Sequence, residues 1–148
     1  AELNSKFPMD QHGGNYFTMW YGIYEASTRT LHYASAGHPP ALLFAGSHAE
    51  PVRLAGEGVP VGMFAETEFS CETFAVPDGA EILLYSDGAF EFPLPDGAAW
   101  SLDDFVALSD AMSASGDWTV DDLARKLQAR TVAGLFSDDC SLLRLRFS

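Results

Sequence analysis

Short apolar runs separated by polar turns fill the first half of the chain, a pattern typical of β-strands. Residues 16–24, YFTMWYGIY, are aromatic and β-branched on both faces, so we expect a strand that is buried on both sides. A turn at 26–29 then leads to a predicted hairpin partner at 30–36. Short strands around a polar turn are predicted at 41–45 and 52–54.

Two more strands are expected around the middle of the chain. Residues 68–76 alternate in polarity, and 81–86 form an apolar run that is fit for burial. The turn sequence Pro-Asp-Gly at 77–79 separates them, so we predict that they pair as a hairpin. The glycine-rich stretch 56–63, GEGVPVGM, is predicted to be a structured loop.

The apolar period changes from two to between three and four after Trp100. Ser101 and Thr119 are each followed by acidic residues, which is the pattern of a helix N-terminus. The apolar positions that follow have helical spacing: Leu102, Phe105, Val106, Leu108 and Met112 after Ser101, and Leu123, Ala124 and Leu127 after Thr119. We therefore predict two helices, then a final strand at 140–147 with Leu143, Leu145 and Phe147 on one face.

This order of elements predicts an α+β fold, with helices gathered on one face of antiparallel sheet. The length of 148 residues suits a single domain over 1–148. At the start, residues 2–7 read as the tail of a helix that Pro8 ends. Nothing precedes this tail for it to pack against, so we expect the chain to begin inside a larger domain.

The composition adds a strongly acidic balance. The net charge of −13 argues against nucleic acid or an anionic membrane as a partner. Between Arg53 and Arg125 the chain has no Lys or Arg but 15 Asp and Glu residues. Such a region is usually a solvated acidic face, although it can also be a face that needs cations to neutralise it. Composition alone does not choose between these two interpretations.

No apolar run is long enough to cross a bilayer, and the first residues lack the plan of a signal peptide. The two cysteines, Cys71 and Cys140, each sit in a strand-like run and are interpreted as small core residues rather than as a disulfide or a metal pair. Together these features favour a reducing, cytoplasmic setting.

The predicted order of elements brings distant carboxylates to one edge of the sheet. The strand at 81–86 ends at Asp87, two helices carry the chain away and back, and the last strand begins after Asp138 and Asp139. If the helices form a simple hairpin, the two strands run antiparallel and share that edge. Asp87 and Asp138 would then be neighbours although they are 51 positions apart.

Carboxylates that converge in this way repel one another unless protons or cations share them. Oxygen ligands without a nearby cysteine or histidine pair favour Mg²⁺ or Mn²⁺ over zinc. Each Asp taken singly is better explained by a role in capping a turn or a strand entry. For the set of acids at one edge we favour a metal site.

Four blocks of the sequence resemble, in this order, the SpoIIE/RsbU-type branch of the metal-dependent Ser/Thr protein phosphatases, the PPM family. They are YASAGHPPALLF at 33–44, GVPVGM at 58–63, ILLYSDGAFE at 82–91 and SDDCSLLRLR at 137–146. The resemblance spans nearly the whole chain. It implies an αββα fold, which is an antiparallel β-sandwich flanked by helices, with a centre of two Mn²⁺ or Mg²⁺ ions at its rim.

By motif match, the resemblance implies that Asp87 and Asp138 are metal ligands. It places Asp139, Glu91 and Gly88 beside them, in supporting positions or as further metal contacts. The segment Gly-His-Pro-Pro at 37–40 is interpreted as a structural corner, in which His38 braces a loop. The family's first metal block, an Asp near a Gly-His-Gly turn, is absent, so the chain is expected to lack the N-terminal strands of the fold.

The resemblance also implies a function in bacterial signalling. Two metal ions would activate a water for attack on a phosphoserine of a small regulatory protein of the anti-anti-sigma type. Such domains often follow sensory or response-regulator receiver domains, and the oligomeric state stays open, with a homodimer among the options.

Two alternatives to catalysis by this chain stay open. A non-catalytic, phosphatase-like adaptor that binds a regulator protein would also explain the missing metal block. A weaker alternative is a small-ligand site around Trp20, Trp100 and Trp118.

Overall fold

A computed structural model describes residues 2–46 and 50–147 of the chain. The chain divides into two compact units. One comprises Ala1–Pro40 and Leu54–Pro77, and the other comprises Ala41–Arg53 and Asp78–Ser148. No helix in the described ranges has the length and apolar character that a membrane span requires.

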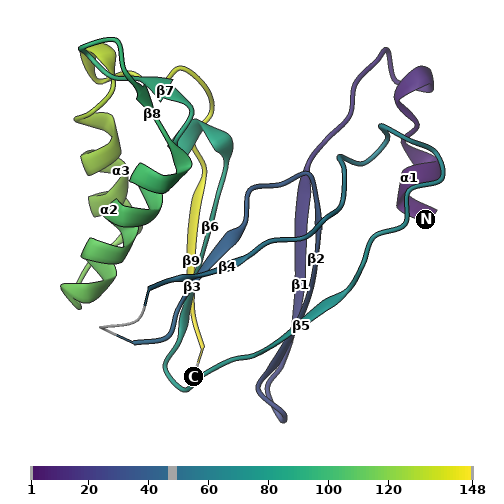
Figure 1. Ribbon diagram of the computed structural model, residues 1–148, viewed down its shortest axis with the longest axis horizontal. Coiled ribbons are helices and arrows are strands. Elements are labelled where there is room, and N and C mark those ends of the chain that lie inside the picture. Colours follow the sequence, from purple (N-terminus) through teal and green to yellow (C-terminus); the bar gives the residue numbers. More distant parts are fainter. Residues whose placement is uncertain (1, 47–49, 148) are drawn as a thin grey trace. The chain divides into compact units, whose positions relative to one another are not determined.

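The first unit is built on a three-stranded antiparallel sheet of order β1-β2-β5, drawn on the right of Figure 1. Its elements are α1 (Glu2–Lys6), the 3₁₀ helix η1 (Met9–Gln11), β1 (Met19–Glu25), β2 (Thr30–Ala36) and β5 (Glu72–Ala75). The predicted hairpin of β1 and β2 is confirmed, with Met19 opposite Ala36 and Glu25 opposite Thr30. The loop 56–63 forms no regular element, but Gly58 bridges to Ala36 at the end of β2 and Val61 bridges to Phe17 ahead of β1.

The expectation that residues 16–24 are buried on both sides is wrong. Tyr21 and Ile23, which share one face of β1, are 55% and 54% exposed. The opposite face is better covered, since Trp20 stacks on Tyr33 at 5.6 Å between ring centroids and donates its indole N–H to the carbonyl of Leu54. An aromatic, β-branched sequence suits a strand with two apolar faces, but it does not supply the element that would cover the second one.

The second unit contains a four-stranded sheet of order β4-β3-β6-β9 and two helices. Its elements are β3 (Ala41–Phe44), β4 (Val52–Leu54), β6 (Glu81–Tyr85), η2 (Asp87–Ala89), β7 (Phe92–Pro93), β8 (Ala99–Trp100), α2 (Leu102–Ala114), α3 (Val120–Gln128), η3 (Val132–Gly134) and β9 (Leu142–Arg146). The short strands predicted at 41–45 and 52–54 are present, and part of the turn between them, 47–49, lies outside the described residues.

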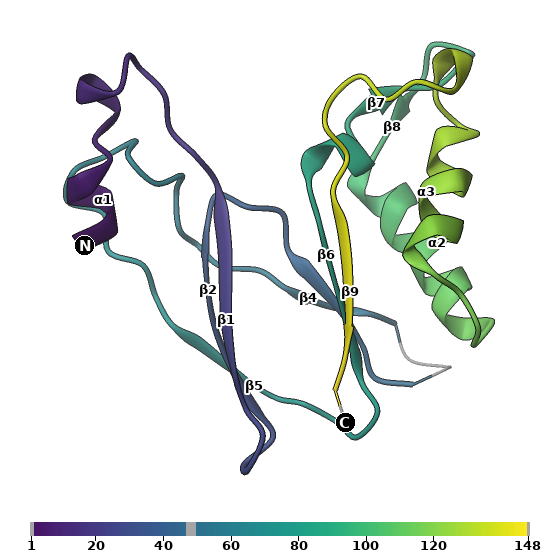
Figure 2. The same ribbon diagram turned by 180° about the vertical axis from the view of Figure 1, so that it is seen from behind.

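Both predicted helices are present and begin where their capping residues stand. Ser101 accepts a hydrogen bond from the backbone N–H of Asp104, whose carboxylate accepts the N–H of Ser101 in return, and Thr119 and Asp122 repeat this capping box. In Figures 1 and 2 the two helices lie side by side along one face of the β6–β9 pair. Their apolar stripes bury Phe105, as well as Leu123 and Leu127, against that face.

The core of the second unit lies between this helix pair and the sheet. Its largest members come from both layers and are almost fully buried: Leu42, Phe44, Leu83, Tyr85, Phe105, Trp118, Leu123 and Leu127. The ring of Tyr85 lies 4.3 Å from that of Phe105. Burial raises the pKa of the Tyr85 hydroxyl well above its ordinary value, while the nearby Arg53 partly offsets this rise. This packing holds the end of β6 rigidly in place.

The predicted hairpin between residues 68–76 and 81–86 is wrong. β5 pairs with β2, whereas β6 lies between β3 and β9 in the other sheet. The turn between them is held at its two ends by different sheets: the Arg29 side chain donates hydrogen bonds to the carbonyls of Val76 and Pro77, and the N–H of Phe147 donates to the carbonyl of Ala80. The turn therefore transfers the chain from one sheet to the other.

The interpretation of both cysteines as core residues is wrong for Cys71. Its side chain is exposed and it precedes β5, while Cys140 is half-buried and precedes β9. Both thiols are free, as expected. Burial raises the pKa of the Cys140 thiol, which keeps it in the neutral form near pH 7.

The three tryptophans are packing residues. Trp118 is buried beneath the guanidinium of Arg144, whose central carbon lies 4.1 Å from the ring centroid, and Trp100 stacks on Phe92 at 6.0 Å. Trp20 lies in the first unit, stacked on Tyr33. The described contacts therefore explain each ring by packing and give no support to a small-ligand site formed by the three.

Candidate metal centre

The end of β6 and the start of β9 lie side by side. The two strands pair antiparallel, with Tyr85 opposite Leu142. The ladder continues one step further, because the N–H of Ser86 donates to the carbonyl of Ser141 at 3.0 Å. In Figure 2 the yellow segment that enters β9 accordingly lies beside the teal segment that leaves β6. The structure thus places the loop that bears Asp87 beside the loop that bears Asp138, as the predicted topology requires.

Asp87 begins the short 3₁₀ helix η2 at the tip of β6. Its main-chain carbonyl accepts the N–H groups of Phe90 and Glu91, at 2.9 and 2.8 Å, so the chain turns sharply directly after the strand. One carboxylate oxygen accepts the N–H of Gly88 at 2.9 Å. The Asp87 side chain is exposed, although Gly88 and Ala89 beside it are buried. A rigid, buried turn therefore presents an exposed carboxylate.

Asp138 is held in a similar local way. One of its carboxylate oxygens accepts the N–H of Asp139 at 2.7 Å. Both aspartates are exposed, in the segment between η3 and β9. The carboxylate of Asp138 is therefore fixed relative to its own loop and open to solvent on its remaining side.

Gly88 lies where the two loops come closest. A Cβ atom on Gly88 would lie 2.5 Å from the carbonyl oxygen of Asp139 and 3.2 Å from that of Asp138, and the first of these distances is a clash with main chain. Only glycine lets the loops approach this closely. Because Gly88 has no side chain, its main chain can lie directly against the loop that bears the other candidate ligand.

The contact between the Asp87 loop and the Asp138 loop, formed by residues 86–91 and 137–141, is called the seam. Glu91 belongs to the seam through its main chain. Its N–H donates to the carbonyl of Asp87, and its own carbonyl accepts the hydroxyl of Ser137 at 3.2 Å. The carboxylate of Glu91 is exposed. The contacts given for Glu91 therefore support the loop geometry.

Ser86 is a member of the seam that the sequence did not single out. Its hydroxyl donates to the carbonyl of Asp139 at 2.8 Å and accepts the N–H of Ser141, also at 2.8 Å. The only hint in the sequence is a hydroxyl residue between the apolar run and Asp87. Its partners are main-chain atoms more than 50 positions away, and only the fold identifies them.

The side-chain donors of the two loops are carboxylate oxygens, the type of ligand that a hard divalent cation prefers. Asp87 and Asp138 are exposed carboxylates, and each uses one oxygen for a local N–H, which leaves the other available. Within residues 2–46 and 50–147, no group of three or more His, Cys, Asp or Glu side chains is placed to hold a metal ion. Asp87 and Asp138 therefore offer at most two ligand side chains within the described residues.

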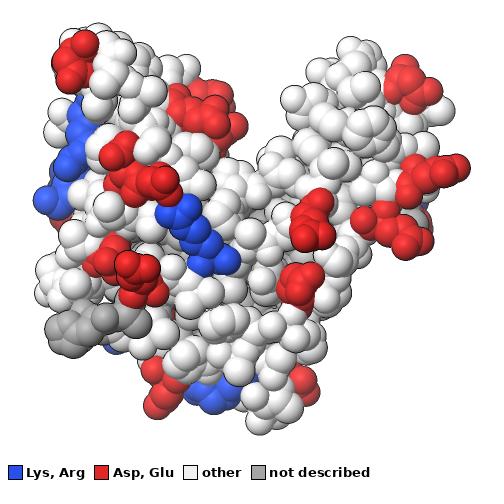
Figure 3. Space-filling view, in the orientation of Figure 1, with Lys and Arg blue, Asp and Glu red and all other residues white. Residues whose placement is uncertain are grey.

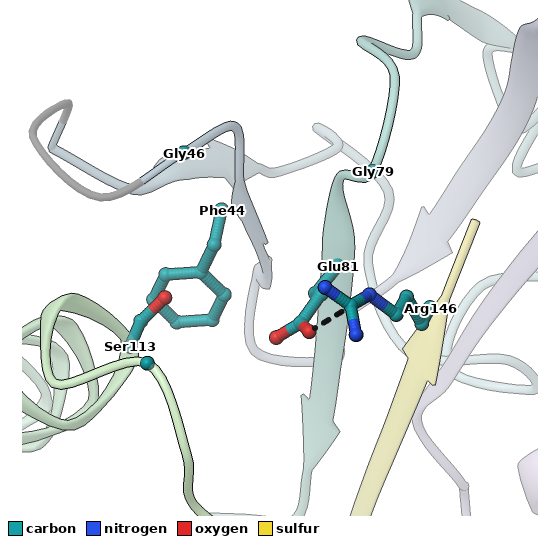
Figure 4. A pocket seen from close by; sticks show the side chains of 7 residues that line it. Phe44, Gly46, Gly79, Glu81, Ser113 and Arg146 are labelled. Atoms are coloured by element: carbon teal, nitrogen blue, oxygen red, sulfur yellow. Dashed lines mark ion pairs between the residues drawn. The ribbon is translucent and has the colours of Figure 1, made fainter. Parts of the chain in front are cut away.

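Other acids are arranged differently. On the face shown in Figure 3, the red carboxylate residues are spread over the surface rather than gathered into one patch. Glu81, at the opposite end of β6, is buried and ion-paired with Arg144 and Arg146. It lines a hollow of about 150 Å³ together with Phe44 and Ser113, and Figure 4 labels these residues. This carboxylate is neutralised within the chain and is not a ligand candidate.

The corner at 37–40 is held by local bonds. Nδ1 of His38 lies 2.8 Å from the carbonyl oxygen of Pro39, and the hydroxyl of Ser35 donates to the carbonyl of His38. Gly37 has a positive φ of 67° and its N–H donates to the carbonyl of Gly58. His38 is therefore engaged in the loop itself, and its role as a brace stays a prediction.

The family model of Stage II sporulation protein E (SpoIIE) matches residues 1–148. The chain belongs to the SpoIIE family. Its sequence is similar to that of the phosphoserine phosphatase RsbP of Bacillus subtilis, with 32% identity over 89 residues. That match covers 60% of this chain and 22% of RsbP.

Solved structures confirm the SpoIIE-type fold. The RsbU and RsbW domains of Rv1364c from Mycobacterium tuberculosis match with a TM-score of 0.69 and 24% identity, over 93% of this chain and 38% of that one. The PP2C phosphatase domain of SpoIIE from Bacillus subtilis, with a fragment of its regulatory domain, matches with a TM-score of 0.68 and 18% identity, over 88% and 37% of the two chains. That phosphatase domain has also been solved after presoaking with Mn.

The predicted fold class is thereby confirmed: antiparallel sheets with helices, arranged as in PP2C-type phosphatase domains. The chain spans well under half the length of these relatives.

Proposed function

We propose that residues 1–148 are part of one PP2C-type protein phosphatase domain, and that Asp87 and Asp138 hold divalent metal in it. Gly88, Asp139 and Glu91 support these ligands. The proposed activity is hydrolysis of a phosphoserine on a bacterial regulatory protein. RsbP, to which the chain is similar, is itself named a phosphoserine phosphatase, which supports this substrate class.

The observation that supports the proposal most is the meeting of the two acidic loops. Asp87 and Asp138 come from opposite ends of the helical pair, yet Gly88 is packed against the carbonyls of Asp138 and Asp139. Strand pairing and the bonds of Ser86 hold the two main chains together, and this places two exposed carboxylates on neighbouring loops. A cation shared by the two loops would offset the repulsion between these acids.

Bound Mn²⁺ or Mg²⁺ would supply an activated water and would neutralise charge on the phosphoryl oxygens. The residues of this chain would hold that metal and fix the orientation of its ligands. Asp87 presents its carboxylate from a turn that the core of the second unit fixes, and Asp138 presents its own from the facing loop. An anionic phosphate would approach these acids only when their charge is balanced.

The test is phosphate release by the full-length protein from a phosphoserine peptide, with Mn²⁺ added or removed by EDTA. We expect activity that depends on Mn²⁺, and a loss of at least about 100-fold in Asp87→Asn, because a metal contributes several kcal/mol to charge stabilisation. Asp117→Asn is the matched control, as Asp117 is an exposed acid in the α2–α3 connection. Far-ultraviolet circular dichroism checks that both variants fold.

Two results would contradict the proposal. Full turnover in folded Asp87→Asn would exclude Asp87 as a ligand. Absence of both turnover and calorimetric heat at millimolar Mn²⁺ in the wild type would instead favour the non-catalytic adaptor, which keeps the fold and binds a regulator protein.

A further inference from the structure

The hydroxyl of Ser86 makes two hydrogen bonds across the seam between the acidic loops. It donates to the carbonyl of Asp139 and accepts the N–H of Ser141, both at 2.8 Å. The main-chain N–H of Ser86 donates to the carbonyl of Ser141 at 3.0 Å. One residue, directly before Asp87, thus binds the facing loop at three points.

The local bonds of the two aspartates do not set their mutual position. Asp87 accepts the N–H of Gly88, and Asp138 accepts the N–H of Asp139, so each carboxylate is fixed only within its own loop. The distance between the carboxylates depends on how the loops are joined. The side-chain bonds of Ser86 join them next to Asp87 on one side and at Asp139 on the other.

We propose that Ser86 is a positioning residue for the metal centre, which holds the Asp87 loop and the Asp138 loop at the spacing that a shared cation requires. This inference rests on the proposed function. The hydroxyl works against the mutual repulsion of the two acids, which would otherwise widen the seam whenever the cation is absent. It does not contact the metal in this role.

The chemistry of the bond restricts the residue type. The position needs one group that both donates and accepts, which Ser and Thr provide, whereas Ala does neither and Cys does both weakly. Residues that orient metal ligands typically change metal affinity or activity by about 10- to 100-fold when they are mutated. A residue that only stabilises the fold would change the free energy of unfolding without this selective effect.

The experiment measures the Kd for Mn²⁺ by calorimetry on the full-length protein, in wild type, Ser86→Ala, Ser86→Thr and Ser115→Ala. We expect Ser86→Ala to raise the Kd by about 10- to 100-fold and Ser86→Thr to stay close to wild type. Ser115→Ala is the matched control, since it removes a serine hydroxyl that donates to the carbonyl of Met112 at the end of α2. If Ser86→Ala does not fold, Ser86→Cys replaces it.

A second readout separates positioning from ligation. The phosphatase activity of Ser86→Ala should recover when Mn²⁺ is raised above the new Kd, whereas that of Asp87→Asn should not. Wild-type affinity in Ser86→Ala, or equal loss in Ser115→Ala, would overturn the role of Ser86 while leaving the proposed function intact. Absence of Mn²⁺ binding in the wild type would overturn both.

Discussion

The guanidinium of Arg144 on β9 forms two hydrogen bonds with the carboxylate of Glu81 on β6, at 2.9 and 2.7 Å. The same guanidinium lies over the ring of Trp118 and donates to its main-chain carbonyl. Glu81 is buried and Arg144 is largely covered. The pair therefore joins the central strand, the last strand and the connection between the two helices.

Removal of this carboxylate should strongly destabilise the second unit. Glu81→Ala leaves a largely buried guanidinium without its partner, and we expect the free energy of unfolding to fall by roughly 3 to 5 kcal/mol. Glu68→Ala, at an exposed position, should change it by less than about 0.5 kcal/mol. Urea unfolding measures both, and similar midpoints for the two variants would contradict this role of the pair.

The aromatic core beneath β6 should be equally sensitive. Phe105 is fully buried, and its ring lies 4.3 Å from that of Tyr85. Phe105→Ala leaves a cavity and should lower the free energy of unfolding by about 3 to 5 kcal/mol. Phe64→Ala makes the same change at a side chain that is 60% exposed and should cost far less. Thermal unfolding followed by circular dichroism compares the two, and equal costs would show that the Phe105 site collapses without a cavity.

Helix α3 should lose part of its support in acid. Hydrogen bonds from Thr119, followed by the bond from Arg125, lower the pKa of Asp122 from 3.8 to about 2. A carboxyl whose pKa is lowered by folding stabilises the folded state above its unfolded pKa, and this contribution is lost as the pH falls from 3.8 toward 2.

The difference in free energy of unfolding between wild type and Asp122→Asn should therefore be constant above this range and shrink within it. Asp121→Asn, in the same turn but outside the capping box, is the control. Urea unfolding at a series of pH values measures both differences. A difference for Asp122→Asn that does not change with pH would show that the capping box does not lower this pKa.

The two neighbouring aspartates before β9 should differ in their response to metal. If Asp138 is the ligand, Mn²⁺ should raise the unfolding temperature of the full-length wild type and of Asp139→Asn more than that of Asp138→Asn, and EDTA should reverse the shift. The main chain of Asp139 is engaged with Ser86, and this contact survives the substitution. The opposite order of the two variants would assign the ligand to Asp139.

Local signals in the sequence predicted the helices and the meeting of the acidic loops. Ser101 and Thr119 fix helix starts through bonds to residues three positions away, so the information lies within one turn. The shared edge of β6 and β9 followed from the expectation that the two helices form a simple hairpin, which returns the chain to the edge that it left. These features need no knowledge of distant partners.

Features that depend on distant partners were missed. Alternation predicted β5 and an apolar run predicted β6, but neither pattern showed that the two strands belong to different sheets. The anchors of their connecting turn are the distant residues Arg29 and Phe147. The two-residue strands β7 and β8 are too short to show a period. The bonds of Ser86 were invisible for the same reason, since its partners are main-chain atoms that carry no residue-type signature.

The order of strands in the second sheet has a consequence for synthesis on the ribosome. β6 can pair with β3 as soon as it emerges, but its other neighbour, β9, follows both helices in the chain. Until residues 142–146 have emerged, the pairing of β6 with β9 that joins the loops of Asp87 and Asp138 cannot form. Under the proposed function, a metal shared by these two loops would bind only after β9 has paired with β6, so a ribosome-bound chain that stops after Asp139 would carry both acids without the pairing that joins their loops.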